Sequence, residues 1–403
     1  METRLKFESE KGFSLSGILH QSDIVDTQAY AILAHCFTCT KSLKAGKKIA
    51  ETLASSGIAT LRFDFTGLGA SKGQFAETSF STDVDDLQSA AKFLTKNYAA
   101  PQVMIGHSLG GTAVLAAASH IESLNAVATI GSPSTPDHIL HMLEDKLEEI
   151  SSVGETTITL AGREFQFKQC FVDDVRNYKL DIGKLGKAIM VLHAPFDDTV
   201  SIREATKIFV AAKHPKSFMS LDKGDHLLTR DEDAIYAGEV IASWAKRFII
   251  PNKNIEKPSL EEGVKVSGET SMGYYNIVQA GPHRFIADEP VSYGGTNKGP
   301  TPYDFLGAAL GACTSMTLNG YARRKSLSVS RVSVNVAHAR IHAKDCDTCE
   351  KADGQIDQFT REIFIEGDIA EADRKRMLEI ADKCPVHKTL ENEIRIVTKL
   401  SEP

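Results

Sequence analysis

VMIGHSLGGTAVLAAASH, residues 103–120, holds a serine between an apolar run and a stretch of small residues. The apolar run is typical of a buried strand, and the small residues are typical of a closely packed helix. The pentapeptide GHSLG at 106–110 would then form the sharp strand-to-helix turn that lifts a serine hydroxyl above a sheet. Its glycines let neighbouring backbone pack closely, and the helix N-terminus offers amide donors to an oxyanion. We therefore predict that Ser108 is a nucleophile.

The stretches on either side of this motif predict an α/β fold with a mostly parallel sheet. Short apolar runs alternate with amphipathic segments, which is the pattern of strands joined by helices. Two alternating stretches, 5–10 and 13–21, predict an antiparallel hairpin at the N-terminus. The later predicted strands are 30–35, 58–65, 102–106, 126–132, 188–194 and 216–222.

A gap at about 133–187 breaks this alternation. It contains an amphipathic segment, 138–150, that predicts a helix, and a stretch, 156–168, that predicts a hairpin. An insertion here would lie above the carboxyl ends of the strands, where ligands bind in such sheets. We therefore expect a small cap over the site.

The 403 residues are enough for two or three domains. An amphipathic stretch at 234–249 predicts a closing helix, and prolines, glycines and charged residues follow it. We predict an N-terminal domain at 1–250, a linker at 251–268 and a C-terminal domain at 269–403.

The composition excludes some classes of function and favours one cellular compartment. Lys and Arg number 46 and Asp and Glu 53, so the formal net charge is −7, which argues against nucleic-acid or anionic-membrane binding. No run approaches the roughly 18 apolar residues that cross a bilayer, and the N-terminal residues lack a signal-peptide core. Seven cysteines are too few, and odd in number, for a disulfide scaffold. We expect a cytoplasmic, reduced protein without a membrane span, whose cysteine chemistry is catalytic, redox or metal-linked.

Two loops at the carboxyl ends of the last predicted strands supply partners for Ser108. A serine nucleophile needs a base, and the base needs a carboxylate to orient it. His226 is the predicted base. Asp197 is the predicted acid, and its neighbour Asp198 stays open as the alternative.

Residues 1–250 resemble the α/β-hydrolase superfamily. Asp-x-x-Val at 197–200 and Gly-Asp-His at 224–226 match the acid and base loops of its esterases and serine peptidases. The resemblance implies an oxyanion hole made by two backbone amides, here those of Phe37 and Leu109.

One position in the predicted oxyanion segment departs from the family. Cys36 stands where the family usually has glycine, and with Cys39 it forms a C-x-x-C. Buried, small apolar side chains are the favoured interpretation, ahead of metal or redox chemistry.

The C-terminal part predicts an α+β domain around one apolar helix. Thr301 would cap that helix and Pro302 would fill its first turn, with Cys313 near its middle. The helix is apolar nearly all round, so we expect it to be central and buried. Predicted strands at 328–343, 358–369 and 393–400 and a helix at 371–384 surround it.

The segments GACTSMTL at 311–318 and CPVH at 384–387 resemble the OsmC/Ohr family of thiol peroxidases, over about 265–400. The resemblance implies that Cys313 attacks an organic hydroperoxide and becomes a sulfenic acid. Cys384 would then condense with it to a disulfide, which a dithiol reductant reopens. Members form intertwined homodimers, so a homodimer is expected.

Two further positions bear on this chemistry. A thiolate in an apolar setting needs a nearby cation, and Arg284 matches the family's arginine loosely. The family holds that arginine with a glutamate, whereas this chain has Tyr303 at that position and Asp304 next to it. Peroxidase activity and a diverged binding or redox role therefore both stay open.

A second C-x-x-C pairs Cys346 with Cys349. His338, Arg340 and His342 share one face of the preceding predicted strand, and two histidines with a C-x-x-C are residue types that bind zinc. A labile disulfide or a solvated loop is the favoured interpretation. We predict no metal and no cofactor.

The leading interpretation is a serine hydrolase for carboxylic esters or related acyl compounds, fused to a thiol-dependent organic hydroperoxide reductase. The hydrolase would release oxidised acyl chains that the second domain reduces. The alternative makes the second domain a non-catalytic dimerisation or ligand-binding module. A peptidase ranks lowest, because the insertion is too small for a propeller-type gate.

Overall fold

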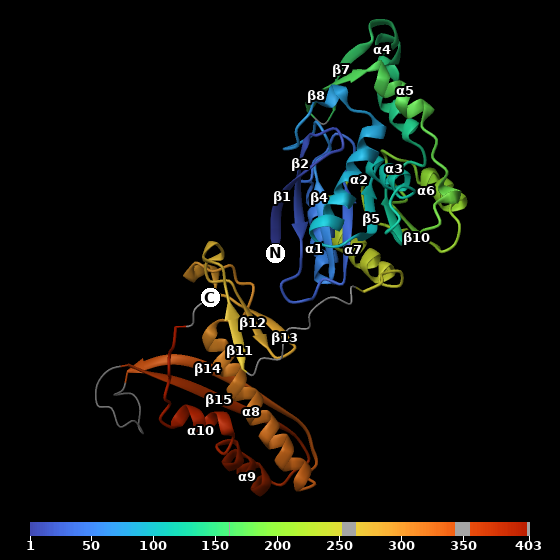
Figure 1. Cartoon of the computed structure of the whole chain (residues 1–403). Coiled ribbons are helices and arrows are strands. Elements are labelled where there is room, and N and C mark those ends of the chain that lie inside the picture. The colour runs from blue at the N-terminus through green and yellow to red at the C-terminus, as the bar shows by residue number, and fades with distance from the viewer. Residues whose placement is uncertain (161, 252–262, 343–354, 401–403) are drawn as a thin grey trace. The chain divides into compact units, whose positions relative to one another are not determined.

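The computed structural model describes residues 1–160, 162–251, 263–342 and 355–400 (Figure 1). The chain forms two compact units, Met1–Ser259 and Leu260–Pro403. A strand begins at Val264, within the stretch 251–268 that the sequence analysis assigns to the linker. Among the described residues, no helix is long and apolar enough to cross a membrane.

The N-terminal unit is built on an eight-stranded sheet, as the alternation of apolar runs predicts. Its first three strands in spatial order pair antiparallel, and every later pairing is parallel. The spatial order is β1 (Glu2–Glu8), β2 (Ser14–His20), β4 (Ile58–Phe63), β3 (Ala29–Ala34), β5 (Pro101–His107), β6 (Ala126–Ile130), β9 (Ala188–His193) and β10 (Lys216–Ser220).

Helices cover both faces of this sheet, so its central strands are buried on both sides (Figure 1). One core cluster joins the sheet to α1 (Lys44–Ser55) and α7 (Asp231–Ala245). The other joins it to α2 (Phe80–Asn97), α3 (Leu109–Ala117) and α6 (Ile202–Ala211). Two short 3₁₀ turns, η1 (Phe75–Glu77) and η3 (Ile182–Lys184), complete the unit.

The predicted insertion forms a small subdomain between β6 and β9, which we call the cap. It comprises η2 (Pro136–Lys146), α4 (Leu147–Val153), the hairpin β7 (Glu155–Leu160) and β8 (Arg163–Lys168), and α5 (Gln169–Asn177). The helix predicted at 138–150 forms in two parts, a 3₁₀ helix that ends at Lys146 and an α-helix that begins at Leu147. Its buried residues are three or four positions apart, a spacing that fits both kinds of helix.

The C-terminal unit has two small antiparallel sheets and three α-helices in its described part. The elements are β11 (Val264–Ser267), η4 (Thr270–Met272), β12 (Asn276–Ala280), β13 (His283–Ala287), η5 (Val291–Tyr293), α8 (Pro302–Arg324), β14 (Val329–His342), β15 (Gln355–Gly367), α9 (Glu371–Ala381) and α10 (Pro385–Glu391). Thr301 caps α8 as predicted, because its hydroxyl accepts the amide of Asp304.

Two predictions for this unit are wrong. Helix α8 is not buried all round: Leu306 is 44% and Met316 72% exposed, because β14 and α9 cover only one side of it. Residues 393–400 pair with none of the described strands and form no strand.

Candidate active site

Ser108 lies between β5 and α3 with φ 56° and ψ −130°, a conformation that L-residues rarely adopt. Its amide donates to the carbonyl of Ile130 at 2.8 Å, which ties the turn to β6. A Cβ on Gly110 would collide with the carbonyl of His35, so glycine is required there for α3 to approach β3. The turn predicted from GHSLG is therefore formed.

Ser108, His226 and Asp197 make one chain of hydrogen bonds. The Nε2 atom of His226 lies 3.0 Å from the Oγ of Ser108, and its Nδ1 lies 2.7 Å from the Oδ2 of Asp197. The Asp197 side chain is 1% exposed and that of His226 is 9% exposed. The structure thus brings together three residues from three separate loops, as the sequence predicts.

The structure also separates the two adjacent carboxylates. Asp197 accepts the amides of Thr199 and Val200 at 2.9 and 2.8 Å through its second oxygen. Asp198 accepts the hydroxyl of Thr199 at 3.2 Å. Burial acts to raise the pKa of Asp197, but the hydrogen bonds from His226, Val200 and Thr199 outweigh it and hold the pKa below its usual value. Asp197 is the carboxylate that contacts the histidine.

Two histidines that the sequence analysis did not single out lie against this chain. The Nε2 of His193, a fully buried residue, lies 2.7 Å from the carbonyl of Val200 and 3.7 Å from the Asp197 carboxylate. The Nε2 of His107 lies 2.6 Å from the carbonyl of His226. Burial lowers the pKa of His107 to about 4, so this ring is neutral and donates its one proton to that carbonyl. Each is the last residue of its strand, β9 or β5, and His107 also lies within the GHSLG motif.

The segment after β3, residues 36–39, holds the predicted oxyanion residue Phe37. Cys36 and Cys39 are joined by a disulfide, so the prediction of two reduced, buried thiols is wrong. Turning the chain back within four residues brings the two Cα atoms to 5.3 Å, within disulfide range. Phe37 and Leu109, the two predicted amide donors, line one pocket. We call residues 36–39 the oxyanion loop.

Aromatic rings and polar side chains together line that pocket. The ring of Phe37 lies 5.7 to 5.9 Å, centroid to centroid, from those of Phe75, Phe167 and Phe171, the last two from the cap. Asp83 also lines the pocket, and burial, together with the nearby Asp86 and Asp174, raises its pKa well above the usual value. Further lining residues are Phe65, Leu68, Thr78 and Ser79.

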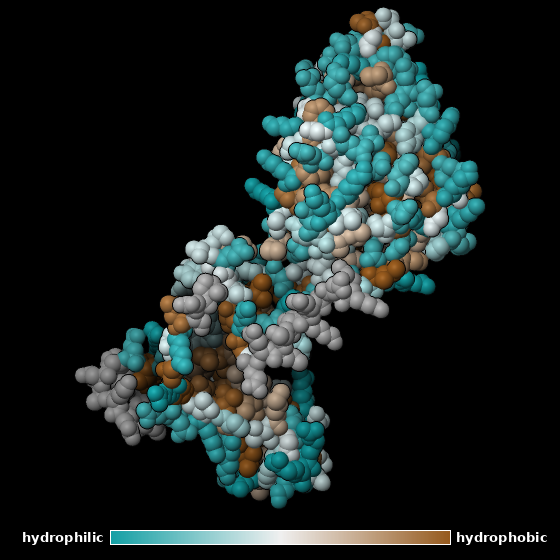
Figure 2. Space-filling model, viewed as in Figure 1, coloured by the Kyte–Doolittle hydropathy of each residue, from teal (hydrophilic) through white to brown (hydrophobic). Residues whose placement is uncertain are grey.

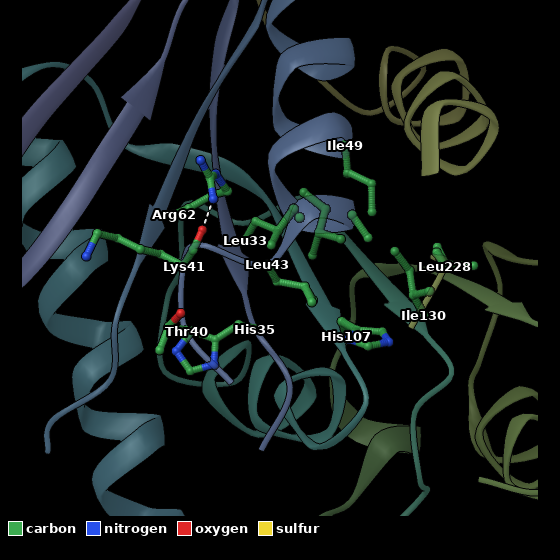
Figure 3. Close-up of a pocket in the computed structure, with 13 residues that line it drawn as sticks. Leu33, His35, Thr40, Lys41, Leu43, Ile49, Arg62, His107, Ile130 and Leu228 are labelled. Carbon is green, nitrogen blue, oxygen red and sulfur yellow. Dashed lines mark hydrogen bonds between the residues drawn. The ribbon is translucent and has the colours of Figure 1, made fainter. Parts of the chain in front are cut away.

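A second cavity lies beside the oxyanion loop, between α1 and the sheet (Figure 3). His35 and His107 line it together with aliphatic side chains such as Leu33 and Ile49. At its edge Arg62 donates to the carbonyl of Lys41, as the dashed line in Figure 3 shows. This contact fixes the chain just beyond the oxyanion loop.

The C-terminal unit places Cys313 and Cys384 near one another as free thiols. Burial acts to raise the pKa of Cys384. The pKa is nevertheless lowered overall, because the Cys384 sulfur accepts the amide of His387 at 3.3 Å and the hydroxyl of Thr314 at 3.7 Å, beside the Cys313 thiol and the cation of Arg361.

The cation beside this pair is Arg361 on β15, which the sequence analysis missed. Its guanidinium donates to Thr314 Oγ at 2.8 Å and to Asp382 at 2.7 Å. The predicted cation, Arg284, lies on β13, where it donates to Gln279 at 2.7 Å. An arginine on a strand about 50 residues away in sequence offers no local motif, which explains the omission.

The remaining predicted positions have other contacts. Tyr303 stacks on His338 at 4.0 Å between ring centroids, and Asp304 accepts the amide of Thr301 in the α8 cap. Cys346 and Cys349 lie outside the described residues.

Comparisons with known proteins find relatives for both units of the chain. The family model for serine aminopeptidase, S33, matches residues 28–133, and that for OsmC-like protein matches residues 295–399. The solved esterase domain of a Rhodothermus marinus protein is 41% identical. The match covers 62% of this chain and 100% of that domain, with a TM-score of 0.51.

Two mammalian relatives match the same region. The mitochondrial palmitoyl-protein thioesterase ABHD10 of Rattus norvegicus is 28% identical over 202 residues, 47% of this chain and 62% of the relative. The chain spans less than two thirds of the length of the curated relatives it matches. The solved mouse alpha/beta hydrolase domain-containing protein 10 is 19% identical with a TM-score of 0.52. The match covers 61% of this chain and 99% of that one, and it shows a shared fold.

Proposed function

Since the chain belongs to the α/β-hydrolase family over its N-terminal unit and continues into an OsmC-like domain, we propose that it is a serine hydrolase of acyl esters or thioesters with a second, thiol-dependent activity. The observation that carries the first activity is the hydrogen-bonded chain from Ser108 through His226 to Asp197. The three groups have the mutual geometry of a nucleophile, a base and an orienting acid.

The reaction would run in two steps. His226 takes the proton of the Ser108 hydroxyl as its oxygen attacks the acyl carbon, and then returns the proton to the leaving alcohol or thiol. In the second step His226 takes a proton from water as the water oxygen attacks the acyl carbon, and the bond between that carbon and the Ser108 oxygen then breaks as His226 returns the proton to Ser108. Asp197 stays ionised, as its lowered pKa supports, and accepts a hydrogen bond from the Nδ1–H of His226. The amides of Phe37 and Leu109 would bind the oxyanion in both steps.

The pocket beside Phe37 supports an acyl substrate rather than a charged one. Its walls include four phenylalanine rings, and Asp83, its carboxyl group, has a raised pKa. Apolar walls favour a hydrocarbon chain. The rat relative is named a palmitoyl-protein thioesterase, so thioesters belong among the first substrates to test.

The substitution Ser108→Ala tests the proposal. We expect kcat on p-nitrophenyl and thioester acyl substrates to fall by about 10⁴-fold or more, since the nucleophile and its base act as one unit. Residual activity within about tenfold of wild type would assign the nucleophile elsewhere.

For the C-terminal unit we propose thiol-dependent reduction of organic hydroperoxides by Cys313 and Cys384. Cys313 is the proposed attacking thiol, because it is partly exposed whereas Cys384 is fully buried. The Cys384 sulfur then displaces water from the Cys313 sulfenic acid, and a dithiol reduces the resulting disulfide. The cation that stabilises the thiolate is proposed to be Arg361, in place of the Arg284 expected from the sequence.

The alternative is a non-catalytic binding or dimerisation module, and the exposed apolar surface of this unit favours it. Figure 2 shows apolar residues at the surface of the C-terminal unit. Met316 and Ile396, which belong to this unit, are 72% and 85% exposed. A homodimer would cover this surface under either proposal. Hydroperoxide consumption by wild type, lost in Cys313→Ser, separates the two roles.

A further inference from the structure

The one disulfide that forms among the described residues closes a small ring around the proposed oxyanion residue. Cys36 and Cys39 enclose Phe37 and Thr38, and the Cys39 amide also donates to the Cys36 carbonyl at 3.1 Å. Thr38 has φ 59°, in the left-handed region that side-chain-bearing residues seldom occupy. The ring therefore holds the loop in a conformation that its own residues do not favour.

Contacts fix both flanks of this loop independently of the disulfide. On one side the Nδ1 of His35 lies 2.8 Å from the Cys36 carbonyl, and its ring packs on Phe65. On the other side the amide of Lys41 donates to Asp64 at 2.6 Å, and Arg62 donates to the Lys41 carbonyl (Figure 3). A change in the disulfide therefore acts first on the oxyanion loop and on the cap residue Arg163, which donates to the Thr38 carbonyl.

The two sulfurs differ in access. Cys36 is 4% exposed, whereas Cys39 is partly exposed, so a small thiol reaches the Cys39 sulfur first. A disulfide in a cytoplasmic protein, the location the sequence predicts, is usually catalytic or redox-sensing rather than structural.

We propose that Cys36 and Cys39 are a redox-active pair that small dithiols reduce, and that reduction slows the hydrolase by releasing the Phe37 amide. The inference rests on the proposed function of Ser108. A thiolate of the dithiol attacks the Cys39 sulfur, the bond between Cys39 and Cys36 breaks, and Cys36 leaves as a thiolate. The second thiol of the reductant then attacks the mixed disulfide, which frees Cys39 and leaves the reductant as its own disulfide. Two electrons and two protons pass from the dithiol to the pair.

This pair connects the hydrolase to the proposed chemistry of the other unit. Both sites draw on a dithiol, so hydroperoxide turnover that consumes the reductant leaves the Cys36–Cys39 bond intact. The hydrolase is then fast under oxidising conditions and slow under reducing ones.

The experiment treats the full-length protein with dithiothreitol, removes the reductant under argon and measures ester hydrolysis. Differential alkylation and mass spectrometry report the state of the Cys36–Cys39 peptide in the same samples. We expect kcat to fall by about tenfold or more on reduction, part of the 10²- to 10³-fold effect of losing an oxyanion donor. KM should change less than about twofold, and oxidised dithiothreitol should restore kcat.

Two variants complete the test. The double variant Cys36→Ser, Cys39→Ser should have the low kcat throughout and not respond to dithiothreitol. The variant Cys170→Ser, which removes an exposed thiol in the cap, should respond as wild type does. Full alkylation of the reduced pair with kcat unchanged would overturn the proposal, as would a pair that resists dithiothreitol in the folded protein. Absence of Ser108-dependent hydrolysis in both states would instead contradict the proposed function, and the alkylation result alone would then decide whether the pair exchanges.

Discussion

Ser108 keeps a backbone conformation that costs of order 1–3 kcal/mol for a residue with a side chain. The surrounding residues stabilise it: Gly110 admits the backbone of His35, and the Ile130 carbonyl accepts the Ser108 amide. The sequence could predict this turn, because only glycine allows such an approach. It could not choose between Asp197 and Asp198, because adjacent side chains point apart in a turn whose angles the sequence does not carry.

Asp197→Asn should lower kcat/KM by about 10³- to 10⁴-fold, because the amide no longer holds His226 in the required tautomer. Its matched control, Asp198→Asn, should change kcat/KM by less than about threefold, since Asp198 contacts Thr199 and not the histidine. Steady-state kinetics on one activated ester measure both variants. Equal losses in the two would refute the assignment of Asp197.

Cys313 and Cys384 give a second prediction at the scale of single residues. In Cys384→Ser, one equivalent of hydroperoxide should leave a sulfenic acid on Cys313, because that thiol is the more exposed. Dimedone trapping and peptide mass spectrometry locate it. A trapped sulfenic acid on Cys384 in Cys313→Ser, with none on Cys313 in the first variant, would reverse the two roles. Because the pKa of Cys384 is lowered, this thiol is a real competitor of Cys313 for the attack, and the two variants distinguish between them.

Helix α6 anchors the start of the cap through a single carboxylate. Glu204 accepts the amide and hydroxyl of Ser134 at 2.9 and 2.6 Å, and Lys207 at 2.6 Å. Burial acts to raise the pKa of Glu204, but these hydrogen bonds lower it to about 2. The sequence predicted the cap and its hairpin, but not this contact, because 70 residues separate its partners.

Glu204→Gln should destabilise the N-terminal unit by about 1–3 kcal/mol at pH 7, the usual range for a hydrogen-bonded charge. A lowered folded-state pKa adds stability above the unfolded value of 4.5, and this is lost as the pH falls toward 2. The difference from wild type should therefore shrink between pH 5 and pH 3 in urea unfolding. A difference that stays constant over this range would mean that the charge of Glu204 contributes nothing.

Two elements of the C-terminal unit were predicted wrongly from the sequence of a single chain. The apolar pattern of α8 predicted burial, and the alternation at 393–400 predicted a strand, yet the first is half exposed and the second is unpaired among the described strands. Contacts with a second copy of this chain would satisfy both patterns. Helix caps and hairpins were predictable because they depend on local residues.

As a whole, the molecule should then be a dimer held by its C-terminal unit. Met316→Lys places a charge on the exposed face of α8 and should shift sedimentation toward the monomer. Met142→Lys, at a residue 51% exposed in the cap, is the matched control and should leave the dimer intact. A wild type that sediments as a monomer at all concentrations would contradict the prediction.

The fusion of the two units predicts a shared substrate pool. A hydroperoxidised acyl ester should be cleaved at Ser108 and reduced at Cys313 more completely by the full chain than by a mixture of Ser108→Ala and Cys313→Ser proteins. Product analysis by chromatography measures this. Equal yields would mean that joining the two units brings no kinetic benefit.

The central claim is that Ser108 is a nucleophile activated by His226. Fluorophosphonate labelling followed by peptide mass spectrometry tests it most directly, with wild type and His226→Ala compared at equal protein concentration. We expect one adduct, on the peptide that contains Ser108, and a labelling rate lower by at least about 10²-fold in the variant, within the usual range for a general base. An adduct on another residue, or the same rate without His226, would contradict the account.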